Sequence, residues 1–218
     1  MKNRPVIIVR HGHTKLNAGT ATSVDKERGW SDVPLNDEGI QEAKDTANKL
    51  KDSGIQVIVC SDLKRGVQTA KIIGDALGVP VTPSALFRPW DLGNLTGKST
   101  KESAPKLKYY AENPDIKVPD GESFNAFRSR AFNGLKEALD QTRGQLLCIV
   151  THHRCERLYE AWIKNGQKPD LSIDIDVFME KGEDPSDFEK VILNESNIGA
   201  ASTKAVVKSL GKAMSGTS

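Results

Sequence analysis

The sequence contains few of the features that assign a chain to a specialised class of protein. Three cysteines occur among 218 residues. An odd number of cysteines without regular spacing argues against a disulfide framework and indicates a reducing compartment. No apolar run approaches the about 20 residues that a membrane-spanning helix needs. No signal-peptide pattern precedes the first apolar run at residues 6–9. We therefore expect a cytoplasmic protein that has no membrane partner.

An excess of charge of either sign is also lacking. The 31 lysines and arginines nearly balance the 29 aspartates and glutamates, so the overall charge does not indicate a nucleic-acid partner. Length and composition are those of one ordinary globular domain, with 37% hydrophobic residues. We expect this domain to span residues 1–199 and to be followed by a C-terminal tail at residues 200–218. No pattern in the sequence indicates an oligomeric state.

The first 82 residues alternate between two kinds of apolar pattern. Apolar residues at helical spacing predict helices at residues 37–51 and 62–77, with Asn36 and Ser61 as their N-caps. Short apolar runs around these helices predict buried strands, at residues 5–9, 55–60 and 80–82. Alternation of strand and helix indicates an α/β fold, in which a mostly parallel sheet has helices on both faces.

The remainder of the chain has a less regular pattern. Residues 83–120 show no clear periodicity, so we expect an irregular segment, and a segment of this length is often functional. Beyond it the pattern predicts a helix at 123–143, a strand at 145–150 and a helix that ends near Lys164. A final pair of strands is expected at residues 171–179 and 188–193.

All four histidines of the chain lie in two clusters. His11 and His13 directly follow the first predicted strand, and His152 and His153 follow the strand at 145–150. The carboxyl ends of parallel strands meet at one edge of an open sheet, and ligands bind at that edge. The two clusters are therefore expected to face a common crevice.

Two arginines are predicted to reach the same crevice. Arg10 immediately precedes His11, and Arg65 falls in the first turn of the helix that follows the second strand. Guanidinium groups bind phosphate oxygens through two parallel hydrogen bonds. A neutral imidazole can attack phosphorus and form a covalent phosphohistidine. The sequence therefore predicts a small cationic pocket for phosphoryl transfer.

Several motifs in this order resemble those of the histidine phosphatase superfamily, which includes cofactor-dependent phosphoglycerate mutases. The motifs are Arg10-His11-Gly12, the segments 29–39 and 61–70, Gly121-Glu122-Ser123 and Val150-Thr151-His152. The resemblance spans about residues 5–195. It implies a three-layer α/β/α sandwich with a mostly parallel central sheet, and a reaction that needs no metal or cofactor.

The resemblance also implies a role for individual residues. His11 would be the nucleophile, and Arg10, Arg65 and His152 would hold the phosphoryl oxygens. Thr14 and Asn17 would line the mouth of the pocket and contact the substrate.

Two positions depart from the family pattern. The family usually carries a glutamate, the proton donor to the leaving group, at the position occupied here by Pro89. We expect Asp91 or Glu122 to replace this acid, with a slight preference for Asp91. His153 stands where the family often has glycine, and we expect it either to narrow the pocket or to bind substrate.

These features favour a phosphatase that hydrolyses a small phosphorylated substrate through phosphohistidine on His11. A phosphoglycerate mutase-type phosphotransfer is the nearest alternative, although the chain is short for a mutase and lacks the usual acid. A catalytically weak phosphate-binding module is a second alternative, because Pro89 has no acidic group. A metallohydrolase is a third, because His-x-His and His-His pairs occur in metal sites, but the carboxylates or thiolates that usually complete such sites are not evident.

Overall fold

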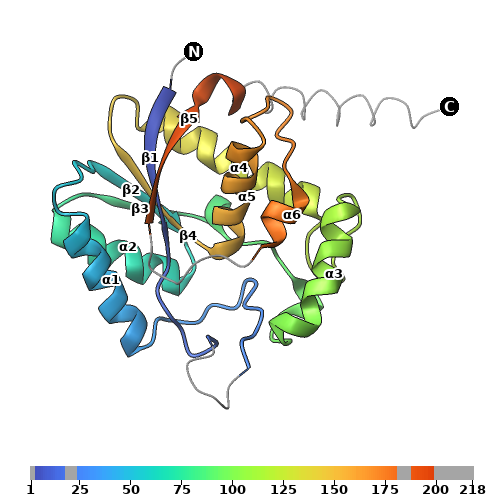
Figure 1. The fold of residues 1–218 in the computed structure, drawn as a ribbon. Coiled ribbons are helices and arrows are strands. Elements are labelled where there is room, and N and C mark those ends of the chain that lie inside the picture. Colours follow the sequence, from blue (N-terminus) through green and yellow to red (C-terminus); the bar gives the residue numbers. More distant parts are fainter. Residues whose placement is uncertain (1–2, 18–23, 181–187, 199–218) are drawn as a thin grey trace, which may run out of the picture.

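The computed structural model describes residues 3–17, 24–180 and 188–198. Its centre is a five-stranded sheet with the strand order β3-β2-β4-β1-β5. The strands are β1 (Asn3–Arg10), β2 (Val57–Ser61), β3 (Val81–Ser84), β4 (Leu147–Thr151) and β5 (Phe188–Asn194). All neighbouring strands run parallel except β5, which pairs antiparallel with β1 at the edge of the sheet (Figure 1).

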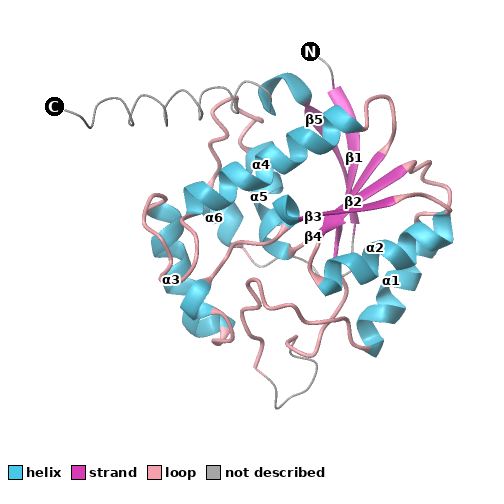
Figure 2. Ribbon diagram, turned by 180° about the vertical axis from the view of Figure 1, so that it is seen from behind, coloured by secondary structure: helices cyan, strands magenta, loops and turns pink. Residues whose placement is uncertain are grey.

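Helices cover both faces of this sheet. On one side lie α1 (Asp37–Lys49) and α2 (Lys64–Leu77), and on the other lie α4 (Phe124–Gln141) and α5 (His153–Lys164), as Figure 2 shows. Two further helices, α3 (Thr100–Glu112) and the short α6 (Ile175–Met179), pack against each other, and α6 also contacts α5. The chain is therefore a three-layer α/β/α sandwich, as the motifs imply.

The side chains of the central strands alternate between the two layers. Ile8 and Ile149 belong to the apolar cluster under α4 and α5, whereas Val9 and Val150 belong to the cluster under α1 and α2. Successive side chains of a strand point to opposite faces of the sheet. A strand that is buried on both faces is therefore a nearly continuous apolar run. Both clusters end at the last residues of β1 and β4, where polar residues begin.

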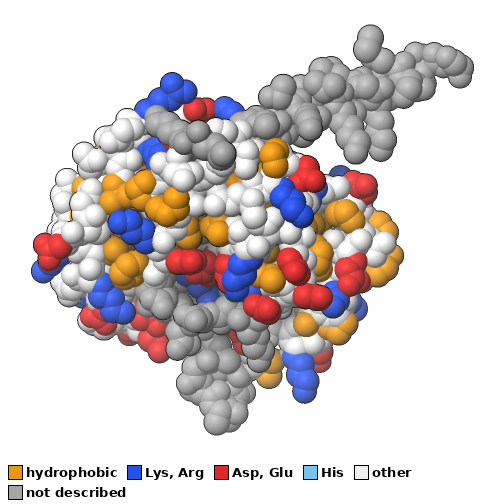
Figure 3. Space-filling view, turned by 45° about the horizontal axis from the view of Figure 1, so that its top comes forward, with side chains coloured by type: hydrophobic (Ala, Val, Ile, Leu, Met, Phe, Trp, Pro, Cys, Tyr) orange, Lys and Arg blue, Asp and Glu red, His pale blue; other side chains and the backbone are white. Residues whose placement is uncertain are grey.

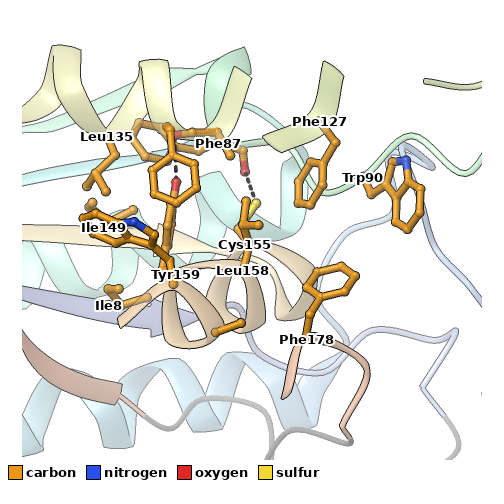
Figure 4. Packing of buried hydrophobic residues seen from close by; sticks show 14 of the residues in the cluster. Ile8, Phe87, Trp90, Phe127, Leu135, Ile149, Cys155, Leu158, Tyr159 and Phe178 are labelled. Carbon is orange, nitrogen blue, oxygen red and sulfur yellow. Dashed lines mark hydrogen bonds between the residues drawn. The ribbon is translucent and has the colours of Figure 1, made fainter. Parts of the chain in front are cut away.

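An aromatic part of the core supports the turn that follows β3. The indole of Trp90 is fully buried and lies near Phe127 and Phe178 (Figure 4). Cys155 Sγ donates to the carbonyl of Phe87 at 3.8 Å and to that of Arg88 at 3.3 Å. These contacts fix the backbone of residues 87–90 against α5.

Three expectations about local structure are wrong. The segment expected to be irregular contains α3, because Ser103, Leu107 and Ala111 recur every four residues and are buried, although Pro105 lies inside the helix. Residues 171–179 are not a strand: Ile175–Met179 is a helix that the side chain of Asp174 caps. The strand at 188–194 is real, but its partner is β1.

The helix after β2 begins later than the sequence predicts. It starts at Lys64, its N-cap residue is Leu63, and no side chain caps it. Ser61 instead ends β2, and its hydroxyl accepts a hydrogen bond from the backbone N–H of Leu63 at 3.3 Å. By contrast, Asn36 and Ser123 cap α1 and α4 through their side chains.

The expected C-terminal tail at 200–218 and its boundary with the domain lie outside the described residues. Within the described residues, no helix combines the length and the apolar character needed to cross a lipid bilayer.

Candidate functional site

The two histidine clusters meet because β1 and β4 are neighbours. Arg10 at the end of β1 pairs in register with Thr151 at the end of β4, and His11 N donates to the carbonyl of Thr151 at 3.0 Å. His11 and His152 therefore leave adjacent strands at the same edge of the sheet. Their ring centroids lie 4.9 Å apart, with an angle of 62° between the ring planes.

Hydrogen bonds determine which nitrogen of His11 carries the proton. Nδ1 lies 2.7 Å from the carbonyl of Gly12, which can only accept, so Nδ1 is the protonated nitrogen. Nε2 lies 3.3 Å from Arg65 Nε, which can only donate, so Nε2 carries the lone pair. Burial, and then the charge of Arg65, holds the pKa of His11 well below its usual value. His11 is thus a neutral imidazole with its nucleophilic nitrogen beside a guanidinium.

Arg65 is held in place by backbone carbonyls. Its Nη1 donates to Ser31 O at 2.6 Å and its Nη2 donates to Gly29 O at 3.0 Å. The side chain is 1% exposed, and burial lowers its pKa to about 9. Carbonyls orient the guanidinium without neutralising its charge, so this charge remains available to an anion.

His152 is buried but has no polar partner. It is 2% exposed, and neither ring nitrogen has a hydrogen-bond partner among the described residues. Leaving a buried polar group unpaired costs about 1–3 kcal/mol. Burial and the charge of Arg65 hold its pKa well below the usual value. A neutral and unsatisfied imidazole beside His11 indicates a place where a ligand supplies the missing hydrogen bonds.

His153 is a second imidazole with an unsatisfied atom. Its buried Nδ1 has no hydrogen-bond partner in the part of the chain that the structure describes, and it lines the same cavity as His152. Burial, and then the charge of Arg10, lowers its pKa to about 2. His153 therefore narrows the cavity as an uncharged group.

These side chains form one end of a cavity of about 670 Å³. The apolar side chains in the lining are those of Pro89, Trp90, Leu92, Ala104 and Met179. The other lining residues are mostly charged and have both signs: Arg10, Arg28, Arg65, Lys101, Arg154, Asp25, Glu27 and Glu180. Basic and acidic side chains are also interspersed over the face of the molecule in Figure 3, so the described residues on this face form no continuous basic surface. Arg10, Arg28 and Arg65 all lie close enough to His11 and His152 that the charge of each lowers the pKa of both imidazoles.

A close backbone approach fixes the loop that carries His11. A Cβ on Gly12 would lie 2.5 Å from Gly39 O, and a Cβ on Gly39 would lie 2.1 Å from His13 O. Side chains are absent at both positions, so the loop rests directly on the first turn of α1. Thr14 and Asn17 belong to this support: Thr14 N and Oγ1 both donate to Asn17 Oδ1, at 2.9 and 3.0 Å. Neither residue lines the cavity, although the resemblance places both at its mouth.

The structure does not bring the two expected acids to the cavity. Glu122 Oε1 accepts from Asp91 N at 2.9 Å and from Arg130 Nη2 at 2.6 Å, so its carboxylate is engaged elsewhere. Arg130 also donates to the carbonyls of Arg88 and Pro89. Asp91 lines a separate shallow hollow, and its Oδ1 accepts a hydrogen bond from Gly93 N at 3.2 Å. Both carboxylates thus accept hydrogen bonds from the backbone of residues 91–93.

Sequence reasoning missed a carboxylate that does line the cavity. Glu27 is 8% exposed and lies in a segment whose sequence shows no periodicity. Its backbone pairs with a distant segment: Glu27 N donates to Lys98 O at 2.9 Å, and Gly97 N donates to Glu27 O at 2.7 Å. Arg154 Nη2 lies 3.5 Å from its Oε1. No local pattern encodes this pairing, so it is visible only in the fold.

The His-x-His pair does not act as a unit. His13 Nδ1 lies 2.5 Å from Glu42 Oε1 on α1, whereas His11 faces the cavity. His13, Glu38 and Glu42 form the one group of three potential metal ligands found among the described residues. This group lies outside the cavity lining, and the residues that the structure describes place no set of three potential metal ligands around His11 and His152.

Comparisons with known proteins agree with the fold and the motifs. The family model described as histidine phosphatase superfamily (branch 1) matches residues 6–176. The probable phosphoglycerate mutase GpmB of Yersinia pestis (strain Pestoides F) is 31% identical over 152 residues, which cover 67% of this chain and 68% of the relative.

Two solved structures share the fold. A mycobacterial glucosyl-3-phosphoglycerate phosphatase has a TM-score of 0.69 at 21% identity, covering 86% of this chain and 92% of its own. A putative α-ribazole-5′-P phosphatase from Escherichia coli has a TM-score of 0.67 at 19% identity, covering 87% of this chain and 90% of its own.

The lowered pKa values predict how stability depends on pH. An unfolded histidine takes up its proton near pH 6.5, whereas His11, His152 and His153 stay neutral in the folded chain to lower pH. Their contribution to stability is fully present above about pH 6.5 and is lost as the pH falls. The free energy of unfolding, measured by urea titration from pH 7.5 to 5, should fall in this window. His152→Asn should reduce the slope by about 1.4 kcal/mol per pH unit. An unchanged slope would contradict the assigned protonation state of His152.

A second prediction concerns the close approach of Gly39. Gly39→Ala should cost about 1–3 kcal/mol of stability, because the added methyl group must displace the backbone of His13. It should also weaken vanadate binding, since the loop with His11 moves. Gly144→Ala is the matched control: it strains a backbone with a φ of 79°, but its Cβ points into open space. If Gly39→Ala binds vanadate as tightly as the control, the loop does not depend on this contact.

Proposed function

The chain belongs to the histidine phosphatase superfamily, and we propose that it is a phosphatase that hydrolyses a small phosphomonoester through a phosphohistidine on His11. The observation that carries this proposal is the state of His11. Its Nδ1 proton is committed to the carbonyl of Gly12, and its Nε2 lone pair faces a cationic cavity. An imidazole in this state is a nucleophile that needs no prior deprotonation.

In the first step, Nε2 of His11 attacks phosphorus while the bond from phosphorus to the leaving oxygen breaks. Arg10, Arg65 and His152 surround the place where the phosphoryl oxygens would lie. Fixed positive groups in a water-poor cavity stabilise the charge that develops in the transition state. A dianion beside His152 would raise the pKa of that imidazole, so substrate binding should protonate it.

In the second step, water attacks the phosphohistidine and the bond between phosphorus and Nε2 breaks. Phosphate leaves, and His11 returns to its neutral form. Arg10, Arg65 and His152 position the phosphoryl group and supply positive charge in both steps. We therefore propose that the reaction requires no metal ion. Activity should therefore persist in EDTA and be blocked by vanadate, an analogue of the pentacoordinate transition state.

Phosphoglycerate mutase-type phosphotransfer is the second candidate, because the Yersinia relative is named a probable phosphoglycerate mutase. Hydrolysis is favoured because the two structural neighbours described above are named phosphatases and share the fold over more than four fifths of this chain. Incubation with 3-phosphoglycerate and a bisphosphate primer separates the two activities. A mutase yields 2-phosphoglycerate, whereas a phosphatase releases inorganic phosphate.

The role of His11 gives a direct test. His11→Ala should lower the turnover of p-nitrophenyl phosphate by about 10³-fold or more, because the nucleophile is removed. Rapid quenching of the wild-type protein should trap a protein-bound phosphate that is labile in acid and stable in alkali, as phosphoramidates are. His11→Ala should trap none. A folded His11→Ala variant that retains wild-type turnover refutes the proposal. A wild-type protein that binds vanadate but never turns over would instead be a phosphate-binding module.

A further inference from the structure

The turn that would carry the family's proton donor offers no acid here. Pro89 lines the cavity at that position, and the nearby carboxylates of Asp91 and Glu122 support the turn from outside. The leaving alkoxide of a phosphomonoester still needs a proton, and a general acid typically accelerates such a step by about 10²–10⁴-fold. The other carboxylates that line the cavity are the candidates for this role.

Three carboxylates line the cavity in the described residues: Asp25, Glu27 and Glu180. The side chain of Asp25 is 44% exposed and pairs with Arg28 at 3.3 Å. The side chain of Glu180 is 57% exposed and pairs with Arg157 at 2.9 Å. The side chain of Glu27 is 10% exposed, so it is the one carboxylate of the three that lies within the protein rather than at the rim.

We propose that Glu27 is the catalytic acid that protonates the leaving-group oxygen, and that Arg154 positions it. This inference rests on the phosphatase function proposed above. Arg154 follows His152 by two residues in the first turn of α5, and its Nη2 lies 3.5 Å from Glu27 Oε1. The guanidinium also lies over the ring of Phe178, 5.7 Å from its centroid. His152 is the N-cap residue of α5 and Arg154 lies in its first turn, so one helix terminus carries both the imidazole at the phosphate site and the group that orients the acid.

The backbone around Glu27 suits a positioned acid. Glu27 pairs with Gly97 and Lys98, Thr100 N donates to Asp25 O at 3.0 Å, and Lys26 bridges to Ser99. These bonds join the segment of Glu27 to the start of α3, which also lines the cavity through Thr100 and Lys101. Glu27 thus sits on a short two-stranded ribbon, not on an unsupported loop.

A general acid must hold its proton at the working pH. Burial raises the pKa of Glu27, while the charges of Arg154 and Arg28 oppose this and that of Asp25 adds to it. The net direction is upward, which favours the protonated form that the first step needs.

The proton balance closes over the two steps. As His11 Nε2 binds phosphorus, the bond to the leaving oxygen breaks and Glu27 donates its proton to that oxygen, leaving a carboxylate. This carboxylate then removes a proton from the attacking water as the bond from phosphorus to Nε2 breaks. The products are the alcohol, phosphate, neutral His11 and protonated Glu27.

The test compares leaving groups, because p-nitrophenolate departs without help and an alkoxide does not. In Glu27→Gln, kcat/KM for an alkyl phosphate such as glycerol phosphate should fall about 10²–10⁴-fold. For p-nitrophenyl phosphate it should stay within about tenfold of wild type. Asp91→Asn is the matched control, since its carboxylate lies outside the cavity, and it should follow wild type on both substrates. Unfolding temperature and vanadate binding show whether Glu27→Gln is folded, and Glu27→Asp should restore part of the alkyl activity.

The role of Arg154 is tested through the pH profile. Activity that depends on a protonated Glu27 falls as the pH rises through the pKa of its carboxyl. Arg154→Met removes a charge that lowers this pKa, so the alkaline limb of kcat/KM should move to higher pH. A purely structural role of Arg154 would lower activity without moving the limb.

Two kinds of failure are distinguishable. If Glu27→Gln loses both substrates equally, or loses neither, while His11 still forms the phosphoenzyme, Glu27 is not the acid and the phosphatase function stands. Glu27 is likewise not the acid if Asp91→Asn shows the selective loss. If wild type forms no phosphoenzyme, the proposed function fails and this inference fails with it.

Discussion

The parallel pairing of β1 with β4 is the constraint on which the site depends. Register places Arg10 opposite Thr151, so the residues that follow, His11 and His152, leave the sheet side by side. The residues of β1 and β4 that precede the site are mostly apolar and buried. Burial of their side chains in the core on both faces offsets the conformational entropy that the strands lose on folding. A slip of one residue would turn each strand's side chains to the opposite layer, so the same packing that stabilises the fold also fixes the spacing of the two imidazoles.

The charges of nearby arginines make the end of the cavity with His11 and His152 electrostatically unfavourable without an anion. Arg10, Arg28 and Arg65 all lower the pKa of both facing imidazoles, and His152 lacks hydrogen-bond partners among the described residues. A dianionic ligand would relieve the repulsion and satisfy the unpaired nitrogens. Under the proposed function, binding and protonation are coupled, because an anion beside His152 would raise the pKa of that imidazole. Such strain at a buried site is maintained by the surrounding structure and is typical of functional positions.

The sequence allows good prediction wherever local pattern and topology agree. The strands that end at Arg10 and Thr151 are visible as apolar runs, and the meeting of His11, His152 and Arg65 follows from the rule for parallel sheets. Prediction fails where the outcome depends on distant contacts. Asp91 is held by contacts with Glu122 and Gly93, and the burial of Glu27 depends on backbone pairing with residues about 70 positions away. The short helix α6 resembles a strand in sequence because five residues contain too few turns to show a helical period.

Part of the cavity wall comes from elements that carry none of the strand-end residues. Lys101 and Ala104 belong to α3, and Met179 belongs to α6. These two helices pack on each other and lie outside the central sheet. Substitutions there can reshape the space for the alcohol part of a substrate while the histidines stay where β1 and β4 hold them. Under the proposed function, the architecture would thus separate the choice of substrate from the chemistry, because the two depend on different elements of the fold.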